Sequence, residues 1–483
     1  MNFKFYNSYT KKLEDFTPRI QGEVSIYSCG PTVYDLAHIG NFRSYVFSDI
    51  LRRSLKAGGY KITHVMNITD VDDKTIRRTT EKNSNPGIND LKEYTAKYIE
   101  EFFVDLDQLG IERVEYYPAA TEHIVPMIAL TEKLLNKGYA YKLDDSIYFS
   151  INRFAEYGKL SGIDLTTVKS GTRYNTDEYT KEDVRDFVLW KTEKENEKIS
   201  WDSPFGKGRP GWHLECSAMI NEIFKGPIDI HTGGIDLMFP HHENEIAQSV
   251  NAYGHDFVKY WLHCEHLLVD GHKMSKSEGN FFTLRDLMNE GYSVLAVRYF
   301  LLSSHYRQKL NFTRDVLKQT GQTLKRIYNF MERFNEAIER EISPEIKKSI
   351  KDASHKLRED FLNELKDDLN TPRALAVLHE AINFTNSQLD LSGNTLDAES
   401  KKELKGLFAI MDSVLNILHF SSNKKNETSS NDAIEHLIQK RDLARKEKNY
   451  RLSDEIRSEI ENMGFEVLDT PQGTRVKSKS VIF

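Results

Sequence analysis

A strand, a helix and a second strand follow one another near the N-terminus, and this pattern limits the fold more than any other feature of the chain. The β-rich run VSIYSCG occupies residues 24–30, helical periodicity covers 41–55, and KITHVMN at 61–67 is a second β-rich run. A crossover of about fifteen helical residues between two strands is typical of a parallel βαβ unit. Such units bind ligands at the carboxyl end of the first strand, where Cys29 and His38 lie.

The sheet is predicted to have two parts with an insertion between them. β-rich runs return at 227–234 and 260–271, whereas residues 121–205 are mixed, polar and broken by glycines. We therefore expect residues 1–120 and 206–315 to be the two halves of one α/β domain with a Rossmann-like, doubly wound parallel sheet. The segment between them would be a connective insertion.

The remainder of the chain is predicted to be mainly helical. Apolar residues recur at helical spacing through 316–420, which indicates a helical bundle. Residues 421–432 carry almost no apolar side chain and are interpreted as a linker. A small C-terminal domain is expected at 433–483, with two short amphipathic helices and a basic run at 440–448. A basic run of this kind is more often solvated surface than an RNA site.

Composition narrows the class of protein without identifying it. Hydrophobic residues make up 39% and charged residues 29%, as in globular proteins, and the net charge of −7 neither favours nor excludes nucleic acid. The three cysteines give no disulfide framework, and Cys264 is interpreted as a buried thiol. No apolar run approaches the ~20 residues of a membrane helix, and the N-terminus lacks the pattern of a signal peptide. We expect a cytoplasmic protein that does not bind membranes.

Two polar segments follow predicted strands in the two halves. The first is His38-Ile39-Gly40-Asn41, where a glycine permits close backbone approach and a helix begins. The second is Lys273-Met274-Ser275-Lys276-Ser277, with two cations and two hydroxyls. Each is weak alone, but together on a split sheet they could hold a triphosphate and stabilise a leaving pyrophosphate.

These segments resemble the two signatures of the class I aminoacyl-tRNA synthetases, His-Ile-Gly-His and Lys-Met-Ser-Lys-Ser. The second is matched in full, whereas Asn41 stands in place of the last histidine of the first. An asparagine amide can donate to phosphate but cannot become cationic, so the pH dependence can differ. The resemblance implies ATP with Mg²⁺ as substrate and catalytic roles for Lys276, His38 and Asn41. The implied ATP-binding residues are His38, Gly40, Asn41, Lys273, Ser275, Lys276 and Ser277.

A second group of residues has the chemistry of a metal site. Cys29 ends the first strand, Cys216 lies in GWHLECSAM, and His241 and Glu245 are four residues apart in FPHHENEIAQ. A spacing of four puts two side chains on one face of a helix, and thiolates with imidazole favour zinc over magnesium. Two buried cysteines and a polar helix are the alternative that this pattern alone leaves open.

Longer runs resemble cysteinyl-tRNA synthetases over most of the chain. They include CGPTVYDLAHIGNFRSYVFSD, NITDVDDK, GWHLECSAM, GGIDLMFPHHENEIAQS and DGHKMSKSEGN. The resemblance implies one Zn²⁺ on Cys29, Cys216, His241 and Glu245, and a substrate pocket containing Gly30, Thr69, Trp212 and Asp236. It also implies tRNA(Cys), cysteine and ATP as partners, a tail that approaches the anticodon, and first attack by the 2′-hydroxyl. We expect a monomer.

Three more histidines, His213, His231 and His242, are candidates for the same pocket. A histidine in a polar cleft is often a hydrogen-bonding wall, and we assign none of them proton transfer. The substrate carboxylate is already a nucleophile at neutral pH, so catalysis can depend on positioning and on charge stabilisation at phosphorus.

Two other functions fit parts of the pattern. A ligase of the same lineage could join cysteine to the amine of a small amino sugar, but its relatives lack much of the tail that this chain carries after residue 315. A catalytically inactive homologue could serve as a zinc-stabilised RNA-binding module. The complete signature at residues 273–277 argues against this second alternative, whereas Asn41 leaves it open.

Overall fold

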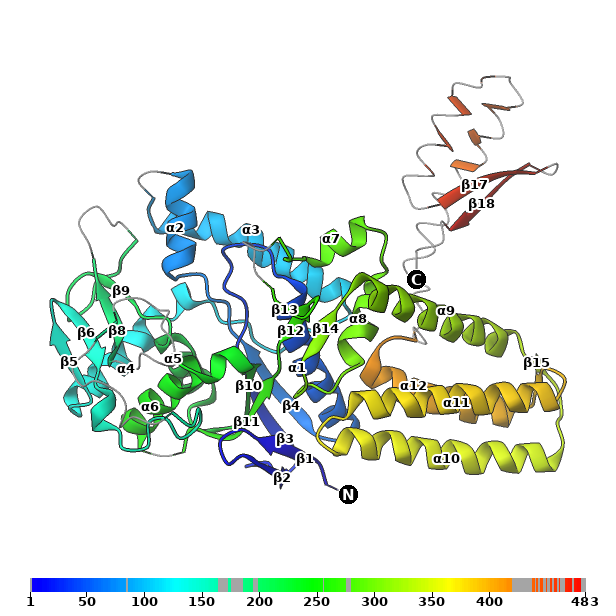
Figure 1. Ribbon diagram of the computed structural model, residues 1–483, viewed down its shortest axis with the longest axis horizontal. Helices are drawn as coiled ribbons and strands as arrows, with labels where there is room; N and C mark the ends of the chain where they lie inside the picture. Colours follow the sequence, from blue (N-terminus) through cyan, green and yellow to red (C-terminus); the bar gives the residue numbers. More distant parts are fainter. Residues whose placement is uncertain are drawn as a thin grey trace. The chain divides into compact units, whose positions relative to one another are not determined.

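A computed structural model describes most of the chain (Figure 1). The described residues are 2–83, 86–163, 173–174, 186–193, 199–254, 256–274 and 279–418, and in the C-terminal part 437–438, 440–441, 444–445, 449, 452–453, 456–457, 460, 465–470 and 473–478. Ser275, Lys276, Ser277 and the predicted linker at 421–432 lie outside them. The chain divides into two compact units. The first unit comprises 1–286, 300–313 and 356–380, and the second comprises 287–299, 314–355 and 381–483.

A four-stranded parallel sheet forms the centre of the first unit, in the order β11-β10-β3-β4 (Figure 1). Its strands are β3 (Glu23–Ser28), β4 (Lys61–Met66), β10 (Ile228–Gly234) and β11 (Val258–Cys264). The helix α1 (Ile39–Ala57) connects β3 to β4. The parallel βαβ unit and the sheet split between two distant segments are therefore confirmed, since β3 pairs directly with β10.

Apolar residues at helical spacing on α1 explain why it covers this sheet. Phe47, Leu51 and Leu55 are buried against residues from β3, β4, β10 and β11, as parallel sheets require. The strand residues of this cluster are Val24, Ile26, Ile62, Ile230, Tyr260, Leu262 and Cys264. The thiol of Cys264 is thus part of the core, as expected from the sequence.

The segment between the two halves contains a second sheet of its own. Its strands are β5 (Ala140–Leu143), β6 (Ser146–Phe149), β7 (Arg173–Tyr174), β8 (Asp186–Thr192) and β9 (Gly208–Pro210), with β5-β6-β8-β7 in order and β9 on β8. Helix α4 (Ile124–Asn136) precedes this sheet, and α5 (Leu214–Phe224) and α6 (His241–Tyr253) follow it. Their apolar faces share one core with the sheet, which includes Leu134, Phe149, Trp190 and Met219.

Smaller elements complete the first unit. They are β1 (Lys4–Asn7), β2 (Lys12–Asp15), α2 (Asp73–Lys82), α3 (Ile88–Gln108), η1 (Ala120–Glu122), η2 (Ile151–Arg153), η4 (Ile235–Met238), β12 (Leu267–Val269), β13 (His272–Lys273) and β14 (Leu310–Phe312). Helix α7 (Leu284–Asn289) contributes residues to both units. Strand β12 pairs with both β13 and β14 to form a small sheet.

The second unit is mainly helical, as the apolar periodicity predicts. It draws on α8 (Val294–Leu302), α9 (Arg314–Glu336), α10 (Pro344–Lys366), α11 (Thr371–Leu391) and α12 (Ala398–Leu415), with the short pair β15 (Ile338–Glu339) and β16 (Thr395–Leu396). The rings of Phe330 and Phe334 on α9 contact Phe408 on α12. A C-terminal hairpin pairs β17 (Phe465–Thr470) with β18 (Gly473–Ser478). Among the described residues, no helix is long and apolar enough to cross a membrane.

A partly buried ion-pair cluster joins the insertion to the start of α2. The Asp73 carboxylate lies 2.9 Å from the Lys191 ammonium on β8 and 2.5 Å from the Arg209 guanidinium on β9. Burial disfavours the Asp73 carboxylate, but Arg209 and Lys191 outweigh it and hold the Asp73 pKa well below its usual value. The two cations are almost fully buried, so this carboxylate supplies much of their compensation.

We predict that Asp73→Asn destabilises the fold by about 1 to 2 kcal/mol at pH 7, after allowance for solvent screening at Asp73. Because the folded-state pKa is depressed, this stabilisation is present above the ordinary carboxyl pKa of about 3.9 and fades as the pH falls below it. Urea unfolding of the protein and the variant at neutral and acid pH measures the difference. Asp107→Asn, which removes an exposed partner of Arg113, is the control. A difference that does not change with pH would contradict this account.

Candidate functional site

The carboxyl end of β3 is a tight crossing between two backbone segments. Gly30 N donates to Asn67 Oδ1 at 2.9 Å. A Cβ atom on residue 30 would lie 1.8 Å from the Asn67 carbonyl oxygen, so only glycine fits here. This contact fixes the backbone beside Cys29, which immediately follows β3.

Four metal-binding side chains converge beside this crossing. Cys216 comes from α5, His241 and Glu245 come from α6, and their ligand atoms and Cys29 Sγ all lie within 4.8 Å of one another. The Sγ atoms of Cys29 and Cys216 are 4.0 Å apart, and Cys216 Sγ is 3.4 Å from His241 Nε2. Zinc bonds of ~2.3 Å to sulfur and ~2.0 Å to nitrogen imply tetrahedral edges of about 3.8 and 3.5 Å. The spacing of the sequence-predicted set therefore fits zinc.

Glu245 gives a second test of this fit. Its Oε1 atom is buried and makes no hydrogen bond, although it lies 3.1 Å from His241 Nε2. Its Oε2 atom is held by His231 Nε2 at 2.9 Å. Glu245 Oε1 and His241 Nε2 therefore approach closely without a hydrogen bond, as two ligands of the same metal ion do. Oε1 is therefore the ligand atom that faces Cys216 and His241.

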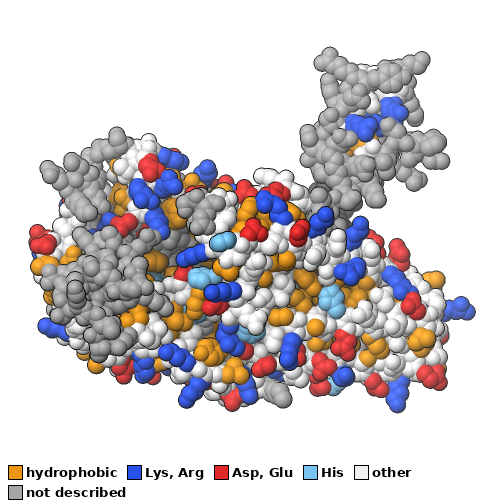
Figure 2. All heavy atoms as spheres, viewed as in Figure 1, with side chains coloured by type: hydrophobic (Ala, Val, Ile, Leu, Met, Phe, Trp, Pro, Cys, Tyr) orange, Lys and Arg blue, Asp and Glu red, His pale blue; other side chains and the backbone are white. Residues whose placement is uncertain are grey.

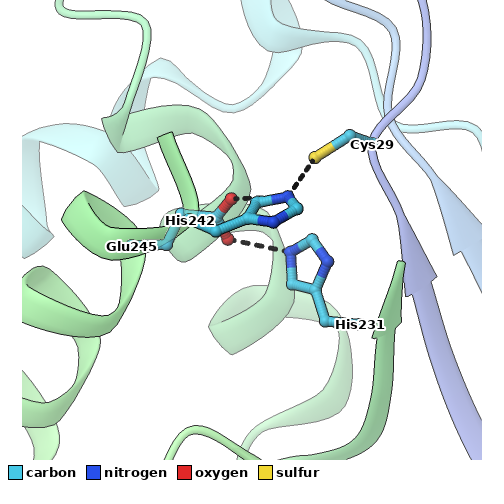
Figure 3. A group of neighbouring side chains, drawn as sticks. All are labelled: Cys29, His231, His242 and Glu245. Atoms are coloured by element: carbon cyan, nitrogen blue, oxygen red, sulfur yellow. Dashed lines mark hydrogen bonds and ion pairs between the residues drawn. The ribbon is translucent and has the colours of Figure 1, made fainter. Parts of the chain in front are cut away.

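His231 and His242, which the sequence places in the pocket without a metal-binding role, offer an alternative donor set with Cys29 and Glu245 (Figure 3). His231 extends from β10, and His242 lies next to the predicted ligand His241 on α6. Thiolate pairs favour zinc more strongly than a single thiolate does, and His231 already bonds the other oxygen of Glu245. We therefore regard the Cys29, Cys216, His241 and Glu245 set as the better zinc site.

His213, His242 and His263 are buried beside this cluster. His242 Nε2 is 3.3 Å from Cys29 Sγ, and its Nδ1 is 2.8 Å from His263 Nε2. Burial lowers the pKa of His242 well below its usual value and that of His263 to about 3, so both rings are neutral at pH 7. His213 Nδ1 lies 3.0 Å from His241 Nδ1 and fixes the orientation of that ring.

Burial and close charges act in opposite directions on the cluster. Burial raises the pKa of the Cys216 thiol well above its usual value. Burial also favours the neutral form of His241, but Cys216 and Glu245 outweigh it and raise the His241 pKa to about 10. The protein alone thus does not favour a thiolate here, whereas a bound cation would, because metal binding and thiol deprotonation are coupled.

The predicted substrate residues lie around the same point. The Thr69 hydroxyl donates to Glu215 Oε2 at 2.7 Å, and Trp212 stacks on the ring of His241 with centroids 4.5 Å apart. Asp236, on η4, is exposed; burial raises the pKa of Cys29, and the charge of Asp236 adds to this shift. The buried Glu215 was not predicted, and its one signal in the sequence is its position beside Cys216.

The first signature forms the N-terminus of α1. His38 is the N-cap, its Nδ1 accepts from Asn41 N at 3.2 Å, and Asn41 Oδ1 accepts from His38 N at 3.1 Å. This reciprocal capping box uses the carbonyl end of the Asn41 amide and leaves the amide nitrogen as the donor for an anion. A Cβ on Gly40 would lie 2.9 Å from the His38 ring, so glycine allows the ring to cover the helix start.

The second signature follows β13, which contains the exposed Lys273. The chain then returns beside the first signature: Ile39 N donates to the Phe282 carbonyl at 2.9 Å, and His38 pairs with Thr283. The described residues on the two sides of 275–278 thus lie in the small sheet at β13 and beside the α1 N-terminus at Phe282 and Thr283.

Two family models match the chain. The model described as "tRNA synthetases class I (C) catalytic domain" matches residues 15–322, and the "DALR domain" model matches 360–419. The first match covers both signatures, the insertion and all four predicted zinc ligands. It defines the class of the protein as class I tRNA synthetase.

Full-length relatives define the family more closely. A cysteine–tRNA ligase of Leptospira interrogans is 46% identical over 99% of this chain and 100% of its own, and one of Brachyspira hyodysenteriae is 47% identical over 98% and 99%. The chain therefore belongs to the cysteine–tRNA ligase family.

Solved structures support the fold at lower identity. The chain resembles a Mycobacterium tuberculosis methionyl-tRNA synthetase in complex with methionyl-adenylate, with TM-score 0.57 and 14% identity over 82% of this chain and 90% of that one. An Agrobacterium radiobacter leucyl-tRNA synthetase gives TM-score 0.59 and 12% identity over 84% and 86%. The Rossmann-like fold class predicted from the sequence is confirmed.

We predict that Gly30→Ala weakens zinc binding by about tenfold or more, because the new methyl group displaces the backbone beside Cys29. Competition with a chromophoric chelator measures the affinity. Gly226→Ala is the matched control, since a Cβ there meets nothing within 4 Å. Equal zinc affinity in the two variants would show that the Gly30 crossing does not position the site.

Proposed function

We propose that this chain activates cysteine with ATP and transfers the cysteinyl group to the 3′ end of tRNA(Cys). The observation that carries the proposal is the convergence of Cys29, Cys216, His241 and Glu245 at the carboxyl edge of the sheet that also carries the α1 signature. Synthetases for different amino acids share this fold, so the fold alone does not identify the substrate. The cluster favours cysteine because its chemistry suits the binding of a thiol.

The reaction has two steps. The cysteine carboxylate attacks the α-phosphorus of ATP, the bond to the bridging oxygen breaks, and pyrophosphate leaves with Mg²⁺. The tRNA 2′-hydroxyl then attacks the carbonyl carbon of the adenylate, the bond from that carbon to the phosphate oxygen breaks, and AMP leaves while the hydroxyl proton passes to its phosphate or to water. The first step requires no protein base, because the cysteine carboxylate is already a nucleophile at neutral pH, and this agrees with the neutral His242 and His263 beside the cluster.

ATP would lie at the α1 N-terminus. The Gly40 backbone N–H and the side-chain amide nitrogen of Asn41 can donate to phosphate oxygens there. Lys273, Ser275, Lys276 and Ser277 would close over the pyrophosphate. The charge of Lys276 would then stabilise the transition state more than the bound substrate.

The enzyme needs the cluster to distinguish cysteine from serine. A pocket that measures size alone rejects so close an analogue by ~10² at best. A bound Zn²⁺ would lower the pKa of the substrate thiol and hold it as thiolate, for which a serine hydroxyl is a poor substitute. The thiols of Cys29 and Cys216, with His241 and Glu245, would hold the ion. Gly30, Thr69, Trp212 and Asp236 would orient the rest of the amino acid.

The proposal includes a monomeric enzyme that acts in the cytoplasm. Exchange of pyrophosphate into ATP with each amino acid, followed by charging of total tRNA, tests the function. Exchange that requires cysteine, with charging of one tRNA species, is the expected result. Exchange without charging, but with cysteine transferred to an amino sugar, would favour the other ligase.

We predict that Lys276→Ala lowers cysteine-dependent exchange by about a hundredfold or more, because a charge-stabilising group is lost. Thermal unfolding should change little. Lys225→Ala, which removes an exposed lysine paired with Glu222, is the control and should retain full exchange. Near-normal exchange in Lys276→Ala would remove this lysine from the mechanism.

We predict about one zinc per chain, and loss of both the metal and cysteine activation in Cys216→Ser. Cys264→Ser is the matched control, because Cys264 is equally buried but lies outside the cluster. Elemental analysis and exchange with cysteine or serine are the measurements. Metal-free protein that still activates cysteine and rejects serine would make zinc merely structural.

A further inference from the structure

Helix α2 and the first half of α3 carry an excess of cations. Residues 73–98 contain six Lys or Arg and four Asp or Glu. Three of these acids are held by internal partners: Asp73 by Lys191 and Arg209, Glu81 by Arg78, and Asp90 by the Gly87 backbone N–H. Several of the cations, including Lys82 and Lys97, are exposed, and Figure 2 shows Lys and Arg side chains gathered in this region.

Tyrosine rings alternate with these lysines. The Lys82 ammonium lies 4.7 Å from the centroid of the Tyr94 ring, and that of Lys97 lies 5.7 Å from the Tyr98 ring. The two rings are 5.2 Å apart and tilted by 48°. Both tyrosines are half-buried, so each side chain is held by its neighbours and also keeps an exposed part. Fixed rings beside cations are the arrangement that binds stacked bases and phosphates of single strands.

The same helices contact the loop that carries the functional site. Tyr94 Oη donates to the Tyr34 carbonyl at 2.8 Å, and the Lys74 ammonium is 5.6 Å from the centroid of the Tyr34 ring. Tyr34 lies between Cys29 and His38, in the segment from β3 to α1. A nucleic acid on these helices would therefore contact the rim of the site where the adenylate forms.

We propose that this surface binds the single-stranded 3′ end of the tRNA on its way to the functional site. We call it the α2–α3 basic surface and define it by Tyr34, Lys74, Lys82, Tyr94, Lys97 and Tyr98. The lysines neutralise phosphates, and the tyrosines stack on the bases. The inference rests on the proposed function, because it assigns the substrate of the second step to this part of the molecule. An acidic protein could pair with the lysines, but it would offer no bases to stack on the two tyrosine rings.

The test is the double variant Lys82→Ala/Lys97→Ala in the full-length zinc-loaded enzyme. Cysteine-dependent exchange, which needs no tRNA, should stay within about twofold, whereas kcat/KM for tRNA charging should fall by about tenfold or more. The dependence of log kcat/KM on log salt should become shallower by about 1.4, since each of the two lost phosphate contacts on a single strand removes about 0.7.

Tyr94 separates stacking from anchoring of the loop. Tyr94→Phe keeps the ring and loses the hydrogen bond to Tyr34, whereas Tyr94→Ala loses both. Stacking predicts that tRNA charging falls in the alanine variant and is largely retained in the phenylalanine variant. Lys225→Ala is the control for general loss of positive charge.

The outcomes distinguish this inference from the function on which it rests. Absence of cysteine-dependent exchange in the unaltered enzyme would refute the proposed function. Normal exchange with unchanged tRNA charging and salt dependence in the double variant would overturn the α2–α3 basic surface alone. Loss of exchange and charging together in the double variant would also overturn it, because a tRNA-binding surface should affect the second step only.

Discussion

Holding two thiols, an imidazole and a carboxylate at one buried point is the constraint on which the rest of the structure depends. Buried polar groups of this kind destabilise a protein unless they are paired or bind a metal. Cys29 and Cys216 are 187 residues apart in the sequence, yet their sulfur atoms lie 4.0 Å apart. The parallel pairing of β3 with β10 accounts for this, because it joins the half of the sheet that ends in Cys29 to the half that leads into α6. The insertion between the halves ends just before α5, which supplies Cys216.

Local features then fix each group against its neighbours. The absence of a side chain on Gly30 lets the backbone beside Cys29 cross that of Asn67. His213 orients the ring of His241, and His231 holds one oxygen of Glu245 so that the other faces the cluster. The reciprocal cap between His38 and Asn41 fixes the start of α1 at the same edge of the sheet. The four-residue cluster and the first signature are therefore positioned by the same four strands.

The sequence predicts much of this arrangement because its strongest signals are local. The βαβ unit follows from strand and helix periodicity, and the pairing of His241 with Glu245 follows from a helical spacing of four. What the sequence does not predict depends on contacts between distant segments. Glu215 becomes visible only through its hydrogen bond from Thr69. The alternative donors His231 and His242 come together only because β10 and α6 lie side by side. The capping role of Asn41 depends on the backbone conformation at His38. The strands of the insertion were also missed, because glycine and polar residues interrupt their alternation.

The central claim is that the four-residue cluster binds zinc and receives the substrate thiol. X-ray absorption at the zinc edge, on the metal-loaded protein with and without amino acid, tests it most directly. The account predicts about two sulfur neighbours at ~2.3 Å in the protein alone, about three when cysteine is added, and no change with serine. A sulfur count that stays the same with cysteine would contradict the account, because the metal would then take no part in recognising the substrate.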